Sequence, residues 1–233
     1  MALVLVTGSN RGIGLELVRQ CAARGDHVIA CCRDPAGATE LAALAQASAG
    51  AIDVRALDVA DADSVADLRI ALGTRPIDVL INNAGVLGPD NARLQINLDA
   101  FAETLAVNTL GPLRMARAFS LNLHDAGADG TPGKIVTITS QMGSMTYGSA
   151  DRMAYRASKA AVNKVMQCLA ADLRQMGVAV LLLHPGWVRT DMGGPGADIS
   201  AQESAAGILA RIDALTLAGT GAFLDHAGRR MPW

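Results

Sequence analysis

Residues 2–14 read Ala2-Leu3-Val4-Leu5-Val6-Thr7-Gly8-Ser9-Asn10-Arg11-Gly12-Ile13-Gly14, and the fold that we predict starts from this segment. Residues 2–6 form a short apolar run, typical of a strand buried on both faces of a parallel sheet. A tight glycine turn follows, and residues 15–24 have the apolar spacing of a helix. Glycines let the backbone approach a pyrophosphate closely, and a helix N-terminus offers it free N–H groups. The segment therefore predicts a dinucleotide phosphate site, with an ordinary structural turn as the alternative.

Apolar strands alternate with helices along the rest of the chain. After residues 2–6, strands are predicted at residues 27–32, 51–57, 77–81, 134–139, 178–183 and 221–224. This alternation predicts an α/β fold, a Rossmann-type doubly wound parallel sheet of about seven strands with helices on both faces. No internal repeat, low-complexity tract or linker interrupts it, so we expect residues 1–233 to form a single domain. Ligands of such sheets bind beyond the carboxyl ends of the strands.

The composition argues against a nucleic-acid partner and against a membrane span. Of the 233 residues, 51% are hydrophobic, 18% are charged and only 3% are aromatic, and the formal net charge is -2. A polyanion would therefore find no basic field and few aromatic platforms for stacking. The cysteines show neither Cys-x-x-Cys spacing nor neighbouring histidines, which predicts no metal site and no disulfide framework. We expect a cytoplasmic protein with reduced thiols, and no apolar run approaches the ~18 residues needed to span a bilayer.

The end of the second predicted strand indicates which dinucleotide binds. In this architecture an acidic residue there accepts hydrogen bonds from the ribose 2′-hydroxyl, whereas an arginine accommodates a 2′-phosphate. Here the strand ends in Cys32 and Arg33 follows, with Arg11 in the glycine turn as a second cation. These residues favour NADP(H) over NAD as the cofactor. Asp34 is the dissenting residue, although Asp34-Pro35 also reads as the N-cap and first residue of a helix.

Polar residues follow three later strands at the same edge of the predicted sheet. Asp58, with Val59 after it, could hydrogen-bond an adenine amino group or simply cap a turn. Asn82-Asn83-Ala84-Gly85 suits a strand end pressed against a ligand, because glycine permits close approach and asparagine amides can fix neighbouring backbone. An ordinary Asn/Gly turn is the alternative. Ser140 comes directly after the fifth predicted strand.

Two predicted helices supply the remaining candidates. Residues 98–124 read as a helix, and Asn108 inside it, with Gly111-Pro112 close behind, predicts a kink together with a functional amide. Tyr155 and Lys159 stand four residues apart in a later helix, so their side chains lie on one helix face. The lysine is expected to lower the tyrosine pKa from ~10, because a cation within ~4 to 6 Å favours the phenolate. A packed tyrosine and a solvated lysine are the alternative for this pair considered alone.

In combination, these motifs resemble those of the short-chain dehydrogenase/reductases from one end of the chain to the other. The resemblance is carried by Thr7-Gly8-x-x-x-Gly12-x-Gly14, Asn82-Asn83-Ala84-Gly85, Asn108, Ser140, Tyr155-x-x-x-Lys159 and Pro185-Gly186. Within that family, residues 184–195 and the closing Met231-Pro232-Trp233 are similar to the C-factor and Sniffer-type carbonyl reductase group. The segment after Thr190 is short, which predicts an open and permissive substrate pocket.

The resemblance implies a role for each motif. Tyr155 would be the general acid toward a carbonyl oxygen during reduction and the base in the reverse direction. Lys159 would lower its pKa and bind the nicotinamide ribose, Ser140 would hydrogen-bond the substrate oxygen, and Asn108 would hold a water in a relay to solvent. The cofactor would contact Tyr155 and Lys159 together with Gly8, Asn10, Arg11, Gly12, Ile13, Gly14, Arg33, Asp58, Val59, Asn83, Ala84, Gly85, Pro185, Gly186, Val188 and Thr190.

One spacing departs from the pattern of the family. Ser140 lies 15 residues before Tyr155, a little farther than is common. Ser144 and Ser149 are rival hydroxyls, although only Ser140 stands at a strand end, and Tyr147 is a rival phenol without a lysine four residues on.

The sequence thus predicts an oxidoreductase that transfers a hydride between NADP(H) and a small carbonyl or alcohol substrate, reducing aldehydes or ketones. The alternative, raised by the C-factor resemblance, is a signalling or redox-sensing protein that binds a dinucleotide with little or no turnover. We also expect a homodimer or homotetramer, because the helices that begin near Leu98 and Tyr155 carry apolar residues on more than one side.

Overall fold

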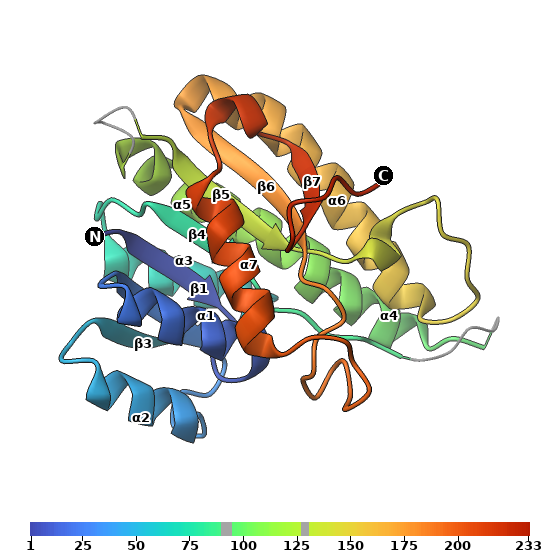
Figure 1. Ribbon diagram of the computed structural model, residues 1–233, viewed down its shortest axis with the longest axis horizontal. Coiled ribbons are helices and arrows are strands. Elements are labelled where there is room, and N and C mark those ends of the chain that lie inside the picture. Colours follow the sequence, from blue (N-terminus) through green and yellow to red (C-terminus); the bar gives the residue numbers. More distant parts are fainter. Residues whose placement is uncertain (90–94, 127–130) are drawn as a thin grey trace.

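Strands from the whole length of the chain lie side by side in one parallel sheet (Figure 1). The computed structural model describes residues 1–89, 95–126 and 131–233. Within these ranges seven strands pair in the order β3-β2-β1-β4-β5-β6-β7, which confirms the predicted Rossmann-type sheet. The strands are β1 (Leu3–Thr7), β2 (His27–Cys32), β3 (Ile52–Ala56), β4 (Val79–Asn82), β5 (Gly133–Ile138), β6 (Val178–His184) and β7 (Ala222–Asp225).

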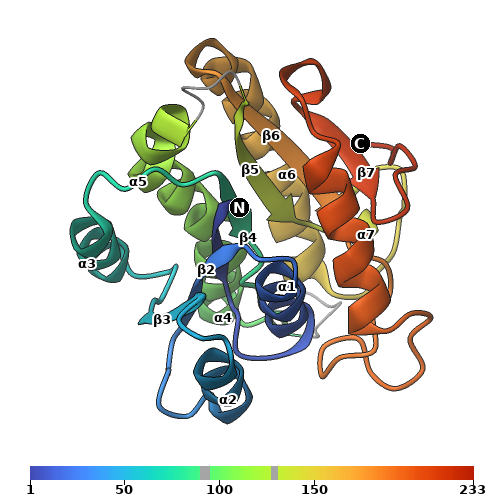
Figure 2. The ribbon, with the colours of Figure 1, turned by 60° about the vertical axis from the view of Figure 1, so that its left-hand side comes forward.

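Helices cover both faces of the sheet (Figure 2). One layer contains α1 (Gly12–Ala23), α2 (Thr39–Ala47) and α7 (Ala201–Asp213). The other contains α3 (Ala62–Leu72), α5 (Gly111–Ala126) and α6 (Met153–Leu173). Shorter elements are α4 (Leu98–Leu105), the π-helix η1 (Ala106–Leu110) and the 3-10 helices η3 (Gln141–Gly143), η4 (Arg174–Met176) and η5 (Leu217–Gly219).

Successive side chains of the central strands point into two separate apolar cores. Leu5 and Ile29, which are register partners, pack toward α3, α5 and α6. Val4 and Val28 pack toward the opposite layer. Each of the four is at most 1% exposed, and burying a side chain of this size contributes ~1.5 to 3 kcal/mol. Burial on both faces explains why the first strand reads as a continuous apolar run instead of an alternating one.

The helix predicted to begin at Asp34-Pro35 begins later, so that prediction was wrong. The α2 helix starts at Thr39, and its N-cap residue Ala38 offers no side-chain cap. The Asp34 carboxylate instead accepts the N–H of Gly37 at 3.1 Å, within the turn that precedes the helix. An aspartate can hydrogen-bond nearby backbone in a turn as readily as at an N-cap, and the local sequence fits both.

The sequence predicted a kink at Asn108, and the structure places a π-helix there, which interrupts the α-helical pattern over residues 98–124. The α4 helix continues into the five-residue π-helix, and α5 follows. A π-helix widens the turn locally, and such insertions are frequent at functional sites. Gly111 follows the π-helix and packs closely against Val59. A Cβ at Gly111 would lie 2.8 Å from Cγ2 of Val59. The interruption therefore lies against the loop that follows β3.

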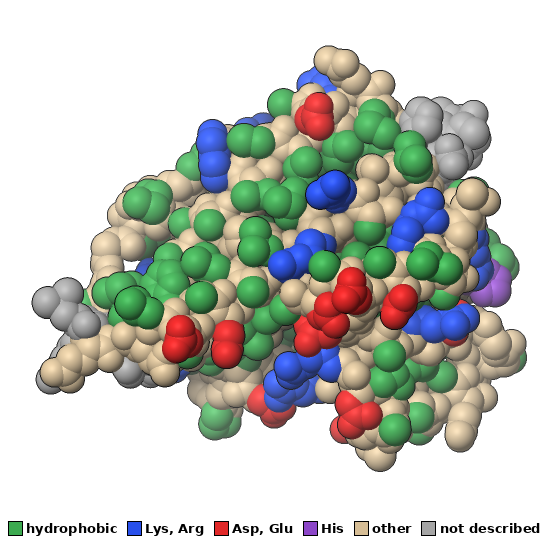
Figure 3. Space-filling view, turned by 180° about the vertical axis from the view of Figure 1, so that it is seen from behind, with side chains coloured by type: hydrophobic (Ala, Val, Ile, Leu, Met, Phe, Trp, Pro, Cys, Tyr) green, Lys and Arg blue, Asp and Glu red, His purple; other side chains and the backbone are tan. Residues whose placement is uncertain are grey.

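Seen from behind, the molecule shows small groups of hydrophobic side chains between basic and acidic ones (Figure 3). Among the described residues, no helix combines the length and the apolar character that a bilayer crossing requires.

Candidate active site

The glycine turn joins β1 to α1 and packs against the residues that follow β4. Gly8 and Gly12 have φ angles of 67° and 56°, in the left-handed region that favours glycine. A Cβ at Gly8 would lie 2.8 Å from Cα of Ala84, and a Cβ at Gly14 would lie 2.5 Å from Nδ2 of Asn83. Neither position has room for a side chain, so the close approach itself requires glycine.

Two polar side chains hold these strand ends together. The Asn83 amide donates to the carbonyl oxygens of Thr7 and Gly8 at 3.0 and 2.9 Å. The Thr7 hydroxyl oxygen accepts the backbone N–H groups of Asn83 and Ala84, each at 3.0 Å. The prediction that an asparagine amide fixes neighbouring backbone is confirmed here. The matching role of Thr7 was not predicted from the sequence.

The first turn of α1 is suited to an anion. Arg11 is the N-cap residue and makes no side-chain cap hydrogen bond. Helix N-termini carry backbone N–H groups without intrahelical partners, and the helix dipole favours negative charge there. The glycine turn, which has no side chains at Gly8, Gly12 and Gly14, and this uncapped N-terminus fit the pyrophosphate of a dinucleotide.

Ser140, Tyr155 and Lys159 come together between the end of β5 and α6. Tyr155 and Lys159 are 8% and 5% exposed. The Lys159 ammonium lies 5.6 Å from the centroid of the Tyr155 ring and donates to the carbonyl oxygen of Ile138 at 2.8 Å. Ser140 is hydrogen-bonded to the Tyr155 side chain. The structure thus brings the predicted serine, tyrosine and lysine into one buried group.

Burial dominates the ionisation of this group. It raises the pKa of Tyr155 to about 12, and the hydrogen bond with Ser140 acts in the opposite direction. Burial also lowers the pKa of Lys159 to about 8. The expectation that Lys159 lowers the Tyr155 pKa below its ordinary value is wrong for this structure, because withdrawing a phenolate from water raises that pKa by more than the hydrogen bond with Ser140 lowers it. The phenol is therefore protonated at neutral pH.

Asn108 lies in the π-helix and binds the backbone that follows β4. Its Oδ1 accepts the N–H of Val86 at 2.9 Å, and its Nδ2 donates to Val86 O at 2.8 Å and to Ser158 Oγ at 2.9 Å. A Cβ at Gly85 would lie 3.3 Å from Oδ1 of Asn108 and 3.7 Å from Nζ of Lys159. Both amide N–H groups are used by protein atoms, so the side chain offers no N–H to the water that the resemblance implied.

The residues predicted to meet the adenosine follow β2 and β3. Arg33 directly follows β2 and is exposed. Arg11 is also exposed and forms an ion pair with Asp191. The Asp58 carboxylate accepts the N–H of Ala60 at 2.9 Å, so of the two predicted roles the structure shows the turn cap.

Residues 185–190 run from the end of β6 toward the glycine turn. Gly186 has a φ angle of 87°, and Val188 is buried. Thr190 packs on Gly12, since a Cβ at Gly12 would lie 3.2 Å from the Thr190 methyl carbon. This segment therefore reaches the same edge of the sheet as the phosphate turn.

Comparison with known proteins agrees with this geometry. Residues 2–198 match the family model described as short chain dehydrogenase. The chain belongs to the short-chain dehydrogenase family. This short-chain dehydrogenase is 44% identical to C-signal of Myxococcus xanthus over 163 residues, which are 69% of this chain and 95% of that protein.

Two solved structures cover all of this short-chain dehydrogenase. The NADPH-bound carbonyl reductase from chicken fatty liver is 36% identical, with a TM-score of 0.91 and 99% of its own chain covered. The carbonyl reductase Sniffer of D. melanogaster is 31% identical, with a TM-score of 0.91 and 100% of its chain covered. Membership of the family makes the protein an oxidoreductase.

A hollow of about 430 Å³ lies at the carboxyl ends of β6 and β7 of this short-chain dehydrogenase, and Ser140, Tyr155 and Lys159 are not among its lining residues. Gln141, the residue after Ser140, lines it together with the aromatic side chains of Tyr147 and Trp187. Residues that follow β7 close its other side. Through Gln141, the hollow borders the residue that follows Ser140.

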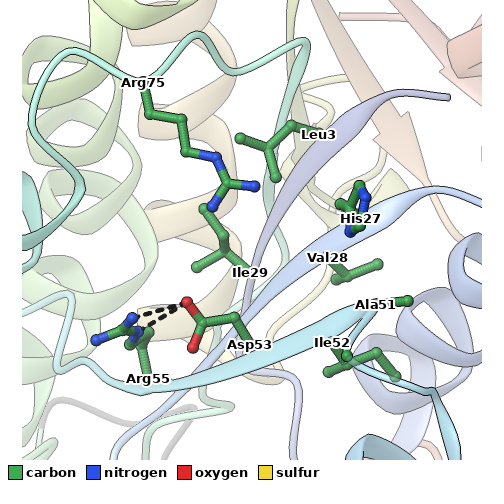
Figure 4. A pocket seen from close by; sticks show the side chains of 10 residues that line it. Leu3, His27, Val28, Ile29, Ala51, Ile52, Asp53, Arg55 and Arg75 are labelled. Carbon is green, nitrogen blue, oxygen red and sulfur yellow. Dashed lines mark hydrogen bonds and ion pairs between the residues drawn. The ribbon is translucent and has the colours of Figure 1, made fainter.

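Another hollow, of about 440 Å³, lies at the amino ends of β1, β2 and β3 (Figure 4). Arg75 and the ion pair of Arg55 with Asp53 face it. None of the predicted site residues lines it, so it is separate from the strand ends that carry the motifs. In the described ranges, no group of three His, Cys, Asp or Glu side chains is arranged to hold a metal ion.

The rival serines are hydrogen-bonded elsewhere. The Ser144 hydroxyl donates to the carbonyl oxygen of Trp233 at 3.1 Å, and the Ser149 hydroxyl bonds a neighbouring carboxylate. Of the three serines, Ser140 is the one hydrogen-bonded to Tyr155. The longer spacing between Ser140 and Tyr155 therefore leaves the pair in contact.

Proposed function

We propose that this short-chain dehydrogenase reduces aldehydes or ketones to alcohols with NADPH. The observation that carries the proposal is the buried group of Ser140, Tyr155 and Lys159, next to a glycine turn that fits a pyrophosphate. A carbonyl oxygen becomes negative as it is reduced, and a protonated phenol beside a hydroxyl can stabilise that charge and then neutralise it.

Each member of the group has its own part in the proposed reaction. The hydroxyls of Ser140 and Tyr155 hydrogen-bond the substrate carbonyl oxygen, and Tyr155 gives that oxygen its proton. In the reverse direction the phenolate takes the proton back. A bound nicotinamide supplies the hydride, while the protein supplies position and electrostatics. The Lys159 ammonium stabilises the negative charge on the phenol oxygen and donates to the nicotinamide ribose hydroxyls.

The cofactor contacts that we propose follow the strand ends in order. The pyrophosphate lies on the glycine turn, including Asn10 and Ile13, and at the N-terminus of α1. The 2′-phosphate pairs with Arg33, and the adenine lies near Asp58 and Val59. The nicotinamide half lies along residues 83–85 and 185–190. The chicken carbonyl reductase structure, which is NADPH-bound, supports NADPH as the dinucleotide.

Replacing Arg33 by alanine should show which dinucleotide the site prefers. Because a hydrogen bond to a charged group is worth ~1.5 to 3 kcal/mol, Arg33→Ala should weaken NADPH binding by about 10- to 100-fold. NADH, which lacks the 2′-phosphate, should be affected far less. Fluorescence titration of both dinucleotides measures the two dissociation constants.

Arg75→Ala is the matched control for Arg33→Ala. Arg75 is also exposed, but it faces the hollow at the amino ends of the strands (Figure 4). Its loss should leave both dissociation constants unchanged. Equal losses of NADPH and NADH affinity in Arg33→Ala would remove the reason for preferring NADP(H).

The match to C-signal favours a second candidate function, a signalling protein that binds a dinucleotide without turnover. The group around Tyr155 argues for turnover, because binding alone does not require a protonated phenol hydrogen-bonded to a serine. A panel of aldehydes, ketones and quinones, assayed with NADPH and with NADH, separates the two functions. We expect NADPH oxidation with at least one class of carbonyl. Tight NADPH binding without oxidation by any of them would favour the signalling function.

We also propose that the protein assembles as a homodimer or homotetramer. Large apolar side chains are exposed on α4, η1, α5 and α6, namely Leu98, Leu110, Leu121 and Met153. Exposed apolar groups of this kind favour association with another protein surface. Light scattering of the purified protein measures the number of chains.

A further inference from the structure

We propose that Ser158 and Thr109 are positioning residues that hold Tyr155 and Lys159 toward the substrate. They would do so through a buried hydrogen-bond chain that links the π-helix to α6. The inference rests on the proposed reductase function, and it adds two residues that none of the sequence motifs assigned to the site.

Ser158 is the centre of this chain. It is fully buried in α6, one residue before Lys159. Its hydroxyl donates to the carbonyl oxygen of Tyr155 at 2.7 Å and accepts from Nδ2 of Asn108 at 2.9 Å. The Thr109 hydroxyl donates to the carbonyl oxygen of Ser158 at 2.9 Å. Two neighbouring residues of the π-helix therefore bind one turn of α6, the turn between Tyr155 and Lys159.

Fixing this turn fixes where the reacting groups point. An α-helix turns by ~100° per residue, so a small rotation of one turn moves the tips of its side chains appreciably. Side chains must be held within ~0.5 Å of productive geometry for full activity. The same turn is also held from β5, through the Lys159 bond to Ile138 and the contact of Tyr155 with Ser140. Together, the hydrogen bonds from η1 and from the end of β5 fix the position of the α6 turn between Tyr155 and Lys159.

The chain continues from Ser158 to the strand end that faces Lys159. Asn108 pairs with both backbone groups of Val86, and Gly85, the residue before Val86, approaches the Lys159 ammonium. Without the Ser158 hydroxyl, one buried N–H of Asn108 would lose its acceptor. A buried donor that loses its acceptor is costly, so the amide would shift and release the backbone beside Lys159.

A comparison of Ser158 with Ser48 separates the proposed positioning role from the role of an ordinary helix serine. Serines inside helices commonly bond a carbonyl one turn back. The Ser48 hydroxyl does so at the end of α2, donating to Ala45 O at 2.6 Å. The Ser48 hydroxyl also accepts a second bond, from the backbone N–H of Ile52 at 3.2 Å. What distinguishes Ser158 is that its second bond comes from the Asn108 side chain, and that Thr109 bonds its own carbonyl. Ser48→Ala is therefore the matched control for Ser158→Ala.

The test measures turnover and cofactor binding separately. Ser158→Ala should lower kcat for carbonyl reduction by about tenfold, while KM and the NADPH dissociation constant change by less than about twofold. Thr109→Val, which keeps the side-chain shape, should lower kcat by about threefold with the same split. Because both variants act on one turn, the double variant should lose less than the product of the two single losses. Ser48→Ala should keep full kcat.

Two results would overturn the positioning role. One is full kcat in a folded Ser158→Ala variant, and the other is an NADPH affinity that falls in step with kcat, which a general structural role would cause. If Ser158→Ala does not fold, Thr109→Val decides in the same way. Tyr155→Phe in the same assay separates this inference from the proposed function. An active Tyr155→Phe defeats both, whereas an inactive Tyr155→Phe beside a fully active Ser158→Ala defeats the positioning role alone.

Discussion

Tyr155→Phe should lower kcat for carbonyl reduction by about 10²- to 10⁴-fold, the usual contribution of a general acid. The substitution keeps the ring, which is 8% exposed, and removes only the hydroxyl that bonds Ser140. The phosphate site lies on the glycine turn and not on this hydroxyl, so the dissociation constant for NADPH should change little. Steady-state turnover and a fluorescence titration of NADPH measure the two effects.

The other tyrosine of the chain supplies the comparison. Tyr147 lies in the lining of the hollow that Gln141 borders, and it is 49% exposed. Tyr147→Phe should therefore cost less than about tenfold in kcat, because no acid is lost from the reacting oxygen. Equal effects of the two substitutions, or unchanged turnover in Tyr155→Phe, would defeat the assignment of Tyr155 as the acid.

Gly14→Ala should abolish measurable NADPH binding and destabilise the protein. The added methyl carbon would overlap the Gly8 carbonyl oxygen and lie 2.5 Å from Nδ2 of Asn83. Backbone and a hydrogen-bonded amide cannot move aside cheaply, and overpacking of this kind costs ~1 to 3 kcal/mol. The added methyl group would push Gly8 and Asn83 away from position 14, in the turn that we propose binds the pyrophosphate. Thermal unfolding with and without NADPH measures both effects.

Gly148→Ala is the matched control, because a Cβ at Gly148 would meet no atom within 4 Å. Its melting temperature and its stabilisation by NADPH should equal those of the unmodified protein. If Gly14→Ala were stabilised by NADPH as strongly as Gly148→Ala, the glycine turn could not be the phosphate site.

The fold could be predicted from the sequence because the residue pattern of each segment agrees with the place of that segment in the folded protein. Residues 2–6 are apolar throughout, and the structure buries this strand between two helix layers. Ser200 and Glu203 stand three residues apart, the spacing of a capping box, and they form one at the start of α7. Asp34 is the exception, because its carboxylate bonds Gly37 in a turn where the sequence fitted an N-cap equally well.

The candidate site could be predicted only in part. The glycines, Ser140, Tyr155 and Lys159 could be named because their spacing places them at strand ends or on one helix face. The raised pKa of Tyr155 was missed, because burial in the folded molecule is not visible in a spacing of four residues. Ser158 and Thr109 were missed because their hydrogen bonds join segments about fifty residues apart.

In the proposed reaction, a nicotinamide and a carbonyl substrate meet at Tyr155, and a hydride passes from the nicotinamide to the carbonyl carbon. NADPH with both hydrogens replaced by deuterium at the nicotinamide carbon that donates the hydride tests this directly, with mass spectrometry of the product. We expect an alcohol that carries the deuterium on its former carbonyl carbon, formed by the unmodified protein and lost with Tyr155→Phe. Deuterium that stays on the dinucleotide while the carbonyl compound is recovered unchanged would contradict the proposed reaction.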